Sequence, residues 1–149
     1  MPIISVTRLR LRSANPLGIG LFFWHTFRSA RQAETKDGFL GGKLLNDAKL
    51  TFWTVTVWES EEAMRKFRNN GDHQRAMRGM KALDRFCSEL AVVTWQSATS
   101  DLPGAATLYQ KLVSEGRSYK LSKASDAHSS RRLDSPTFRG GRRLKPRQG

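Results

Sequence analysis

The sequence predicts one α+β domain whose elements follow the order β-α-β-β-α-β. Three observations predict it: a strand with period-two alternation near the start, an aromatic and β-branched strand at 49–58, and two segments in which apolar residues recur at helical spacing. This order is the ferredoxin-like arrangement, in which helices cover one face of an antiparallel sheet. The length of 149 residues suggests a single domain with an appendage.

The first predicted strand shows alternating polar and apolar residues, and the first predicted helix shows apolar residues at helical spacing. Residues 3–12 place arginines on one side and mainly leucines on the other, as in a strand with one partly solvated face. Residues 19–35 show helical spacing, with Phe23 and Phe27 in the apolar stripe. Gly38 follows this helix and is a candidate for a left-handed cap.

Two strands follow, at 39–46 and 49–58, and the second carries large apolar groups on both faces. One face has Leu50, Phe52 and Trp58, and the other has Trp53, Val55 and Val57. A strand with one wet face would alternate more cleanly. Because the helices cover only one face, we expect a twofold pairing of sheets from two copies to cover the other. The predicted assembly is a homodimer that forms a dimeric α/β barrel.

The remaining elements complete the pattern. Ser60 is placed to cap a helix, and a second helical piece is predicted from Asp72 to about Phe86. Residues 89–96 are typical of a fourth strand. The predicted organisation is therefore a ferredoxin-like domain over 1–100, a short C-terminal helix over 101–116, and a disordered basic tail over 117–149.

Most of the excess charge lies in the predicted tail. The chain has a net charge of +13, and residues 117–149 hold ten Lys/Arg against two Asp. Few apolar residues interrupt this segment, so its composition is typical of disorder. Such a tail either keeps the protein in solution or associates with nucleic acid or another anionic surface. The candidate anion-binding residues are Arg131, Arg132, Arg139, Arg142, Arg143, Lys145 and Arg147.

Several classes of protein are excluded by composition and motifs. Cys87 is the single cysteine, which excludes an internal disulfide and a cysteine-built zinc site, and we expect it to be a buried thiol in a helical stretch. No clustered metal ligands, dinucleotide fingerprint or nucleophile elbow occur. The start lacks the features of a signal peptide, and the longest apolar run is too short to span a bilayer. A cytoplasmic location is expected.

The segment FLGGKLLNDAKLTFWTVTVWESEEAMRKFRNNGDHQRAM, residues 39–77, carries a resemblance to a known family. A strand ends at Trp58, an acidic helix start follows, and Met64, Phe67 and His73 come downstream. This layout resembles the dimeric α/β-barrel superfamily, which includes antibiotic-biosynthesis monooxygenase-like and haem-degrading proteins. Within it, the segment is most similar to an uncharacterised bacterial branch distantly related to spheroidene monooxygenase. The resemblance covers residues 1–96.

The resemblance implies an apolar pocket between the sheet and the helices, suited to a small hydrophobic, flat or polyunsaturated ligand. His73 is the candidate catalytic residue, as general base or axial ligand. The alternative for His73 is an exposed or capping histidine at a helix start. The candidate pocket residues are Trp24, His25, Phe52, Trp53 and Trp58, for which packing in the core is the alternative.

No cofactor is assigned from the sequence. Haem-degrading relatives use an Asn on the first strand, and residues 3–12 contain none, which argues against haem. Three functions remain open. The first is a monooxygenase-like enzyme acting on a hydrophobic substrate. The second is a non-catalytic dimeric protein that binds a small ligand, and the third is association with anions or nucleic acid through the tail.

Overall fold

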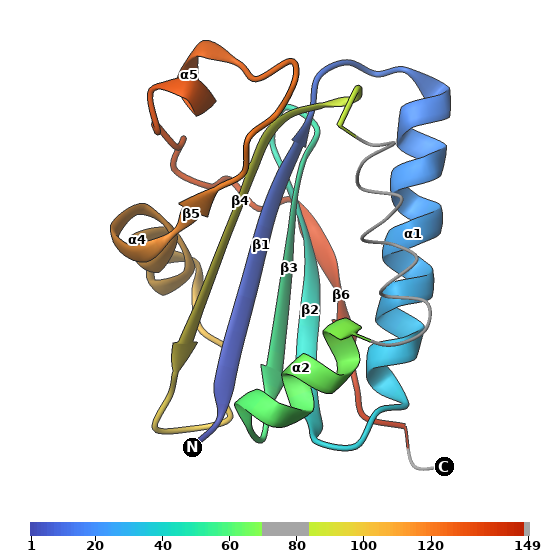
Figure 1. Cartoon of the computed structure of the whole chain (residues 1–149), viewed down its shortest axis with the longest axis vertical. Helices are drawn as coiled ribbons and strands as arrows, with labels where there is room; N and C mark the ends of the chain where they lie inside the picture. The colour runs from blue at the N-terminus through green and yellow to red at the C-terminus, as the bar shows by residue number, and fades with distance from the viewer. Residues whose placement is uncertain (70–83, 148–149) are drawn as a thin grey trace.

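The computed structural model describes residues 1–69 and 84–147, and Figure 1 shows the arrangement of its elements. The strands are β1 (Ile3–Leu11), β2 (Phe39–Asp47), β3 (Thr51–Trp58), β4 (Cys87–Gln96), β5 (Arg117–Ser118) and β6 (Gly140–Leu144). The helices are α1 (Pro16–Glu34), α2 (Glu61–Asn69), α4 (Ala105–Glu115) and α5 (Asp126–Ser129).

The sheet has the predicted ferredoxin-like core and two additional edge strands. Its strand order is β5-β4-β1-β3-β2-β6, and every neighbouring pair is antiparallel. The central four strands, β4-β1-β3-β2, confirm the β-α-β-β-α-β prediction. The outer strands β5 and β6 both come from the segment that the sequence predicted to be a disordered tail.

Local signals in the sequence explain where the first helices begin and end. Asn15 caps α1, because its side chain accepts a hydrogen bond from the backbone N–H of Leu17, and Pro16 occupies the first helical turn. Gly38 has a φ of +84°, as its predicted left-handed role requires. Ser60 accepts a hydrogen bond from the N–H of Ala63 and so caps α2 as predicted.

The face of the sheet that α1 and α2 cover is called the helix face here. On β3 it carries Phe52, Thr54 and Trp58. Leu9, Phe22 and Leu90 form one apolar cluster on this face. A second cluster joins Trp58 and Phe67 with the end of α1, and Leu144 of β6 is part of it; its buried members are Ile3, Ala30, Ala33, Phe39, Trp58, Met64, Phe67 and Leu144.

The opposite face, called the tail face, carries Trp53, Val55 and Val57 on β3. It is covered by the chain itself. Leu108 and Leu112 of α4 are buried against it, and Phe138 packs against the same cluster. A second copy was expected because this face would otherwise be exposed to water. In the structure, α4 and the segment around Phe138 cover it within one chain. The homodimer remains a prediction that a single chain does not test.

The segment 117–147 is folded onto the domain, contrary to the expectation of disorder. Strand β6 pairs with β2, and Leu144 is only 1% exposed. Past β6, the Arg147 Nε lies 3.0 Å from the carboxylate Oε2 of Glu34, a buried residue at the end of α1. The few apolar residues of this segment reach all three apolar clusters, Leu133 and Phe138 on the tail face and Leu121 and Leu144 on the helix face, which composition alone does not reveal.

Two further sequence predictions concern the region before β4. Cys87 is buried as expected, but it is the first residue of β4 and does not lie in a helix. Burial raises the pKa of its thiol to about 12, so the group stays protonated near neutral pH. Most of the predicted helical piece, including His73, lies outside the described residues, and its described end at 84–86 forms turns. Over the described ranges, no helix has the length and hydropathy needed to cross a membrane.

Candidate ligand-binding pocket

A pocket of about 220 Å³ lies on the helix face between α1, β2, β3 and β6. Phenylalanine is the commonest residue in its wall: Phe22, Phe23 and Phe27 come from α1 and Phe52 from β3. The rings contact each other, since Phe22 and Phe52 are 4.7 Å apart between centroids and Phe23 and Phe52 are 5.4 Å apart. Leu44 of β2 completes the apolar lining. Such a wall suits a flat hydrophobic molecule.

The polar groups of the pocket are few. Thr26, Asn46 and Thr54 supply neutral hydrogen-bonding side chains. Arg142 of β6 is the one charged residue among the described lining, and its guanidinium carbon lies 5.9 Å from the centroid of the Phe27 ring. The pocket therefore offers an aromatic interior with a single cation beside it.

Strand β6 closes one side of this pocket, and Gly141 allows it to approach β2 closely. A Cβ at Gly141 would lie 2.2 Å from the carbonyl oxygen of Leu44 on β2. This distance is shorter than any ordinary carbon–oxygen contact, so a side chain at this position would displace β6. On β2 itself, a Cβ at Gly42 would lie 2.5 Å from the carbonyl oxygen of Val55, so this glycine serves the pairing of β2 with β3. Gly141 thus lets β6 bring Arg142 to the pocket.

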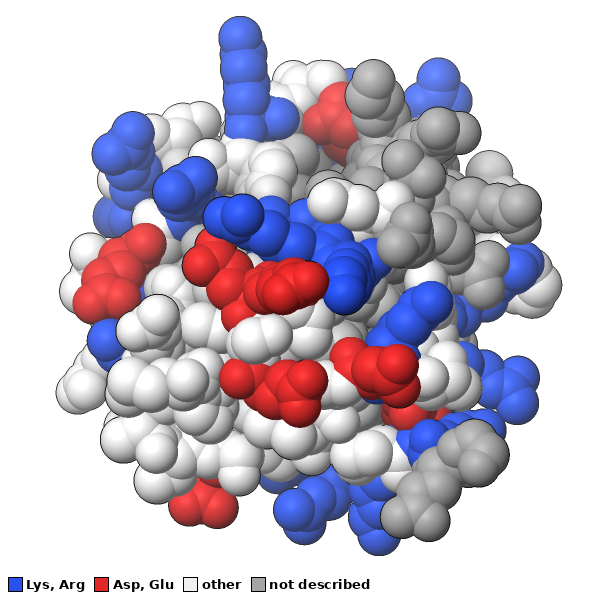
Figure 2. All heavy atoms as spheres, turned by 60° about the horizontal axis from the view of Figure 1, so that its bottom comes forward, with Lys and Arg blue, Asp and Glu red and all other residues white. Residues whose placement is uncertain are grey.

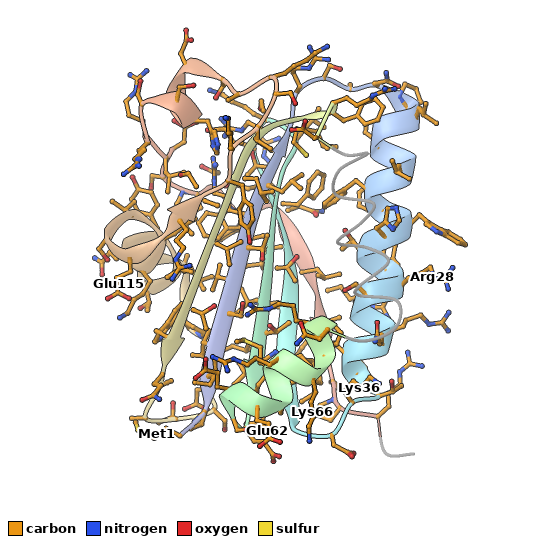
Figure 3. All side chains as sticks on the ribbon, viewed as in Figure 1. Met1, Arg28, Lys36, Glu62, Lys66 and Glu115 are labelled. Atoms are coloured by element: carbon orange, nitrogen blue, oxygen red, sulfur yellow. The ribbon has the colours of Figure 1, made fainter. Side chains whose placement is uncertain are left out.

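The structure separates the aromatic residues that the sequence grouped as pocket candidates. Phe52 lines the pocket. Trp24 does not: it is 59% exposed on α1, and the guanidinium carbon of Arg28 lies 5.2 Å from its ring centroid. Figure 3 shows Arg28 pointing away from the sheet. Trp24 therefore lies on the outer side of the helix, because two positions along the helix place it nearly opposite the buried Phe22.

Trp53 adjoins the pocket within β3, but its indole belongs to the tail face. The ring packs edge-on against Phe138, and its Nε1 donates a hydrogen bond of 3.0 Å to Oδ2 of Asp47. Strand alternation explains the difference, because the side chains before and after it, Phe52 and Thr54, point to the helix face. Trp53 is thus a core residue with a satisfied N–H.

Trp58 and the histidines complete the predicted set. Trp58 is fully buried between Phe39 and Phe67, with ring centroids 5.2 and 4.9 Å away, and it is not part of the pocket wall. His25 is half-buried on α1 and is also not part of that wall. His73 lies outside the described residues, so its predicted role as base or axial ligand stays a prediction.

The described residues around the pocket do not fit a haem or a metal. Its lining contains no histidine, cysteine, methionine or tyrosine that could serve as an axial ligand. Within 1–69 and 84–147, no three His, Cys, Asp or Glu side chains lie close enough to hold a metal ion. The described lining residues instead support binding of a ligand through ring contacts and hydrogen bonds.

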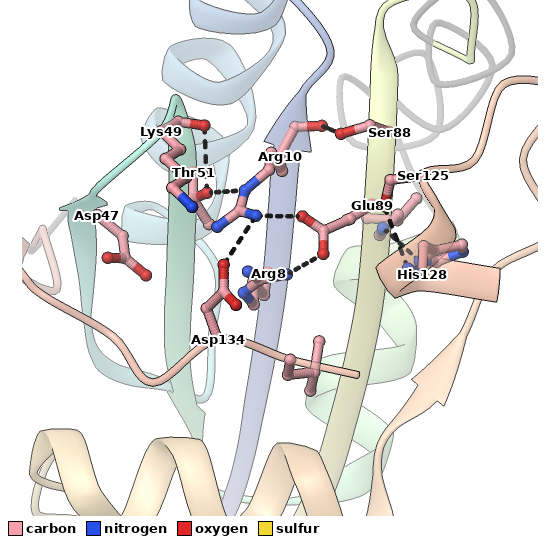
Figure 4. Close-up of polar contacts among 12 residues, drawn as sticks. Arg8, Arg10, Asp47, Lys49, Thr51, Ser88, Glu89, Ser125, His128 and Asp134 are labelled. Carbon is pink, nitrogen blue, oxygen red and sulfur yellow. Dashed lines mark hydrogen bonds and ion pairs between the residues drawn. The ribbon is translucent and has the colours of Figure 1, made fainter. Parts of the chain in front are cut away.

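A cluster of buried charges lies on the tail face and is drawn in Figure 4. Arg8 and Glu89 are 0% and 1% exposed, and their closest charged atoms are 3.6 Å apart. Arg10 pairs more closely with Glu89, at 2.8 Å, and also donates a hydrogen bond of 3.1 Å to Asp134 of the tail. Its Nε donates to the hydroxyl of Thr51 at 2.6 Å.

Burial and pairing shift the pKa values in this cluster. Loss of water around the guanidinium lowers the pKa of Arg8, and the charge of Glu89 opposes that effect. Among the residues that the structure describes, none forms a hydrogen bond with the Arg8 nitrogens. The pKa of Asp134 is lowered, chiefly because Arg10 donates a hydrogen bond to its carboxylate. The cluster therefore ties the tail to β1 and β4 electrostatically.

The histidine that the structure uses most clearly is His128, which the sequence analysis did not single out. Its Nε2 lies 2.6 Å from the carbonyl oxygen of Tyr119, and its Nδ1 accepts a hydrogen bond from the N–H of Leu90. The neutral tautomer with a proton on Nε2 satisfies both contacts. His128 thus connects α5 to β4 through a hydrogen bond, and no pattern in the sequence predicts that contact.

The basic residues predicted to bind anions fall into two groups. Arg131 and Arg132 follow α5 beside β4, whereas the other five lie in or beside β6 next to β2. These are opposite edges of the sheet, so the tail does not form one basic patch. Figure 2, a view of the lower end of Figure 1, shows acidic side chains gathered among the basic ones.

The sequence did not assign to the pocket the lining residues that the inner side of α1, β2 and β6 bring to it, although it indicated Arg142 as a candidate anion-binding residue. Phe22, Phe23 and Phe27 could have been identified from their helical spacing, which places them on neighbouring turns. Arg142 could not, since it lies 98 positions from Leu44, its partner in the β2–β6 pairing. Only the folded chain brings the two together.

Comparison with known proteins agrees with this fold. A family model described as antibiotic biosynthesis monooxygenase matches residues 23–79. Among curated proteins, none matches this chain in sequence.

Several solved structures share the fold at low sequence identity. A variant of SnoaB, a cofactor-independent oxygenase from Streptomyces nogalater, is 17% identical, with a TM-score of 0.51 over 69% of this chain and 98% of that one. Rv0793 from Mycobacterium tuberculosis is 12% identical, with a TM-score of 0.57 over 68% of this chain and 100% of that one. An antibiotic biosynthesis monooxygenase assigned in Nitrosomonas europaea is 8% identical, with a TM-score of 0.55 over 65% and 90%.

These matches extend over about two thirds of this chain and nearly the whole of each neighbour. The ferredoxin-like core is therefore shared, and a further segment of this chain has no counterpart in them. The chain has the α+β fold of the antibiotic biosynthesis monooxygenase-like proteins and resembles that superfamily in both sequence and structure.

Proposed function

We propose that this protein binds a small, flat, hydrophobic molecule in the pocket between α1, β2, β3 and β6, and oxygenates it there without a bound cofactor. The observation that carries the binding part is the wall of four phenylalanines with only three neutral polar side chains and one cation among them. The oxygenation part rests on the fold, which is shared with a cofactor-independent oxygenase. Fold alone does not fix chemistry, so the reaction needs its own test.

The size of the pocket limits the ligand. Its volume of about 220 Å³ is below the range of about 300–1,000 Å³ that is usual for drug-sized ligands. A molecule of one or two fused rings is the expected occupant. A polyunsaturated substrate, as the sequence resemblance implies, would place one such segment in the pocket.

Binding is tested with 2-acetylnaphthalene, a neutral two-ring ketone, by titration of its fluorescence. The variant Thr26→Trp places a bulky ring in the pocket and should weaken binding by at least about tenfold, a loss of about 1.4 kcal/mol. Trp24→Ala changes the outer side of the same helix and should leave binding unchanged. Equal affinity for Thr26→Trp and the unmodified protein would contradict the proposed pocket.

The oxygenase activity is tested with 2-tetralone, a two-ring ketone with an activated CH₂ group. Conversion of that CH₂ to a carbonyl by O₂ releases one water, so one O₂ should be consumed for each ketone group formed. An oxygen electrode measures the uptake in the presence of a metal chelator. Thr26→Trp should abolish the enzyme-dependent part of the uptake.

The second candidate is a protein that binds the same kind of ligand without turning it over. A specific observation favours it: the described lining residues include no histidine or carboxylate that could act as a general base. Binding of 2-acetylnaphthalene with no O₂ uptake on 2-tetralone or on related ketones would support this candidate over the enzyme.

Association of the tail with nucleic acid is best tested by point substitutions. Removal of residues 117–149 would also remove side chains that pack in the core. Arg131→Gln with Arg132→Gln changes only exposed side chains at the β4 edge. If the tail binds DNA or RNA there, retention on a nucleic-acid column should fall and its dependence on salt should become less steep.

A further inference from the structure

We propose that the pocket prefers an anionic ligand and that Arg142 is the residue that recognises its charged group. The inference rests on the proposed binding function and adds the chemical class of the ligand: a flat hydrophobic body that carries a carboxylate or an enolate at one end. Three features of Arg142 carry it: its place in the pocket wall, its lack of a carboxylate partner, and its direction from β6.

The register of β6 directs Arg142 to the pocket. It pairs with Leu44, which in turn pairs with Thr54, and both of those residues line the pocket on the helix face. Side chains alternate along a strand, so the neighbouring Arg143, which pairs with Lys43, belongs to the opposite face. Two adjacent arginines are thus separated by the sheet, and only Arg142 is part of the pocket wall.

Other arginines of this chain have acidic partners that Arg142 lacks. Arg10 pairs with Glu89 and Asp134, and Arg147 pairs with Glu34. No ion pair or hydrogen bond joins the Arg142 side chain to the residues at 1–69 or 84–147, and its guanidinium lies over the Phe27 ring. The described pocket wall contains no aspartate or glutamate. No described acidic side chain therefore pairs with the Arg142 guanidinium, which is exposed to solvent beside the aromatic pocket and accessible to a ligand.

A carboxylate is the group that this arrangement fits. A guanidinium binds a carboxylate through two parallel hydrogen bonds, which are stronger than bonds between neutral groups. Because the Arg142 side chain is exposed and Phe27 is 42% exposed, water competes for this bond, and the bond strengthens where the ring system of the ligand displaces that water. The ring system of the ligand would lie against Phe22, Phe23 and Phe52, with Thr26, Asn46 and Thr54 available for a further oxygen.

The test compares two probes of nearly equal shape: 2-naphthoate, which is an anion at pH 7, and methyl 2-naphthoate, which is neutral. Their dissociation constants are measured by fluorescence titration with the full chain. We expect the anion to bind about tenfold more tightly than the ester, the ratio typical of a hydrogen bond to a charged group. The preference should weaken as the salt concentration rises.

Three variants then assign the preference to one side chain. Arg142→Met keeps the aliphatic stem and should reduce the ratio of the two affinities to near one, with the ester bound as before. Arg142→Lys restores the charge and should recover part of the ratio. Arg143→Met removes the neighbouring charge on the opposite face and should leave the ratio unchanged.

The outcomes separate this inference from the proposed function. If the unmodified protein binds both probes equally, or if Arg142→Met keeps the full preference, the inference is overturned while the pocket stands. An equal reduction of the affinity ratio in Arg143→Met and Arg142→Met would also overturn the inference, because it would indicate a general effect of net charge. If neither probe binds the unmodified protein, the proposed pocket fails and the inference fails with it.

Discussion

At the scale of single residues, Arg8 and Glu89 show how this sheet tolerates charge in its interior. Both side chains are buried on the tail face, and neither forms a hydrogen bond with another described residue. Glu89 nevertheless makes two ion pairs, at 2.8 Å with Arg10 and at 3.6 Å with Arg8, whereas Arg8 makes only the longer one among the described residues. The desolvation of a buried charge often exceeds what its ion pair returns. The two residues of the Arg8–Glu89 pair therefore contribute unequally to stability.

This inequality predicts different results for two substitutions. Arg8→Met removes a desolvated charge and leaves Glu89 paired with Arg10, so we expect the free energy of unfolding to change little. Glu89→Gln leaves two guanidinium groups facing each other and should lower it by about 3–5 kcal/mol. Urea unfolding measures both, and similar losses in the two variants would contradict this account.

The ion pair between Arg10 and Asp134 predicts a dependence of stability on pH. The hydrogen bond from Arg10 holds the pKa of Asp134 below its ordinary value. Because the pKa is lower in the folded protein, the pair stabilises the fold above about pH 3.9, the usual aspartate value, and this contribution is lost as the pH falls through the folded pKa.

The measurement is the difference in Tm between the unmodified protein and Asp134→Asn as a function of pH. We expect the unmodified protein to be more stable at pH 6 and the difference to shrink towards pH 2.5. The difference should be small, because the Asp134 side chain is 57% exposed and water screens the pair. A difference that is constant over this range would show that the carboxylate charge is not involved.

At the scale of elements, strand β6 decides the shape of the pocket. It is short, and four of its five residues are exposed. What holds it is its ladder with β2, the buried side chain of Leu144, and the hydrogen bond of 2.7 Å from the backbone N–H of Arg147 to the carbonyl oxygen of Glu34. An element with so little buried area depends on close backbone contact.

Gly141→Ala tests that dependence. A Cβ at this position would meet the Leu44 carbonyl, so β6 would have to move, and we expect the free energy of unfolding to fall by about 1–3 kcal/mol. Binding of 2-acetylnaphthalene should weaken as well, because β6 forms one wall of the pocket.

Gly20→Ala is the matched control for Gly141→Ala. A Cβ at Gly20, within α1, meets nothing within 4 Å, so this change should instead stabilise the protein by up to about 1 kcal/mol. Thermal unfolding and the same titration compare the two variants. A loss in the Gly20 variant equal to that in the Gly141 variant would contradict the steric explanation.

At the scale of the whole molecule, the C-terminal third extends the fold of the shared domain on both sides. It adds β5 beside β4 and β6 beside β2, and between them it crosses the tail face, where Phe138 packs against Trp53. Figure 1 shows this path, with α4 and α5 on one side of the sheet and β6 near α1 on the other. The tail face is thus covered without a second copy.

This arrangement predicts the mass of the particle in solution. Pairing of two sheets through the tail face would require α4 and the tail to leave it, so we expect light scattering to give the mass of one chain, 16.9 kDa, at micromolar concentration. Phe138→Ser together with Leu144→Ser should release the tail and increase self-association, because the apolar face becomes exposed. A stable dimer of the unmodified chain would support the sequence-based homodimer and would imply that the tails are exchanged.

The fold could largely be predicted from the sequence because its signals are local. Alternation in β1 and β3, the cap at Ser60 and the positive φ of Gly38 each depend on residues within a few positions of one another. The pocket was predicted only in part. Phe52 lines it, whereas Trp24, which was predicted to line it, is exposed on the outer side of α1.

The sequence by itself determined the ferredoxin-like core and the presence of large apolar groups on both faces of β3, since hydrophobic periodicity records which side of an element must avoid water. It did not determine what covers the second face. That was decided by tertiary structure, because Phe138, Leu144 and Arg142 act through contacts with strands nearly a hundred positions away. Isolated apolar residues in a basic segment form no local pattern. Their contribution to the core depends on the distant strands against which they pack.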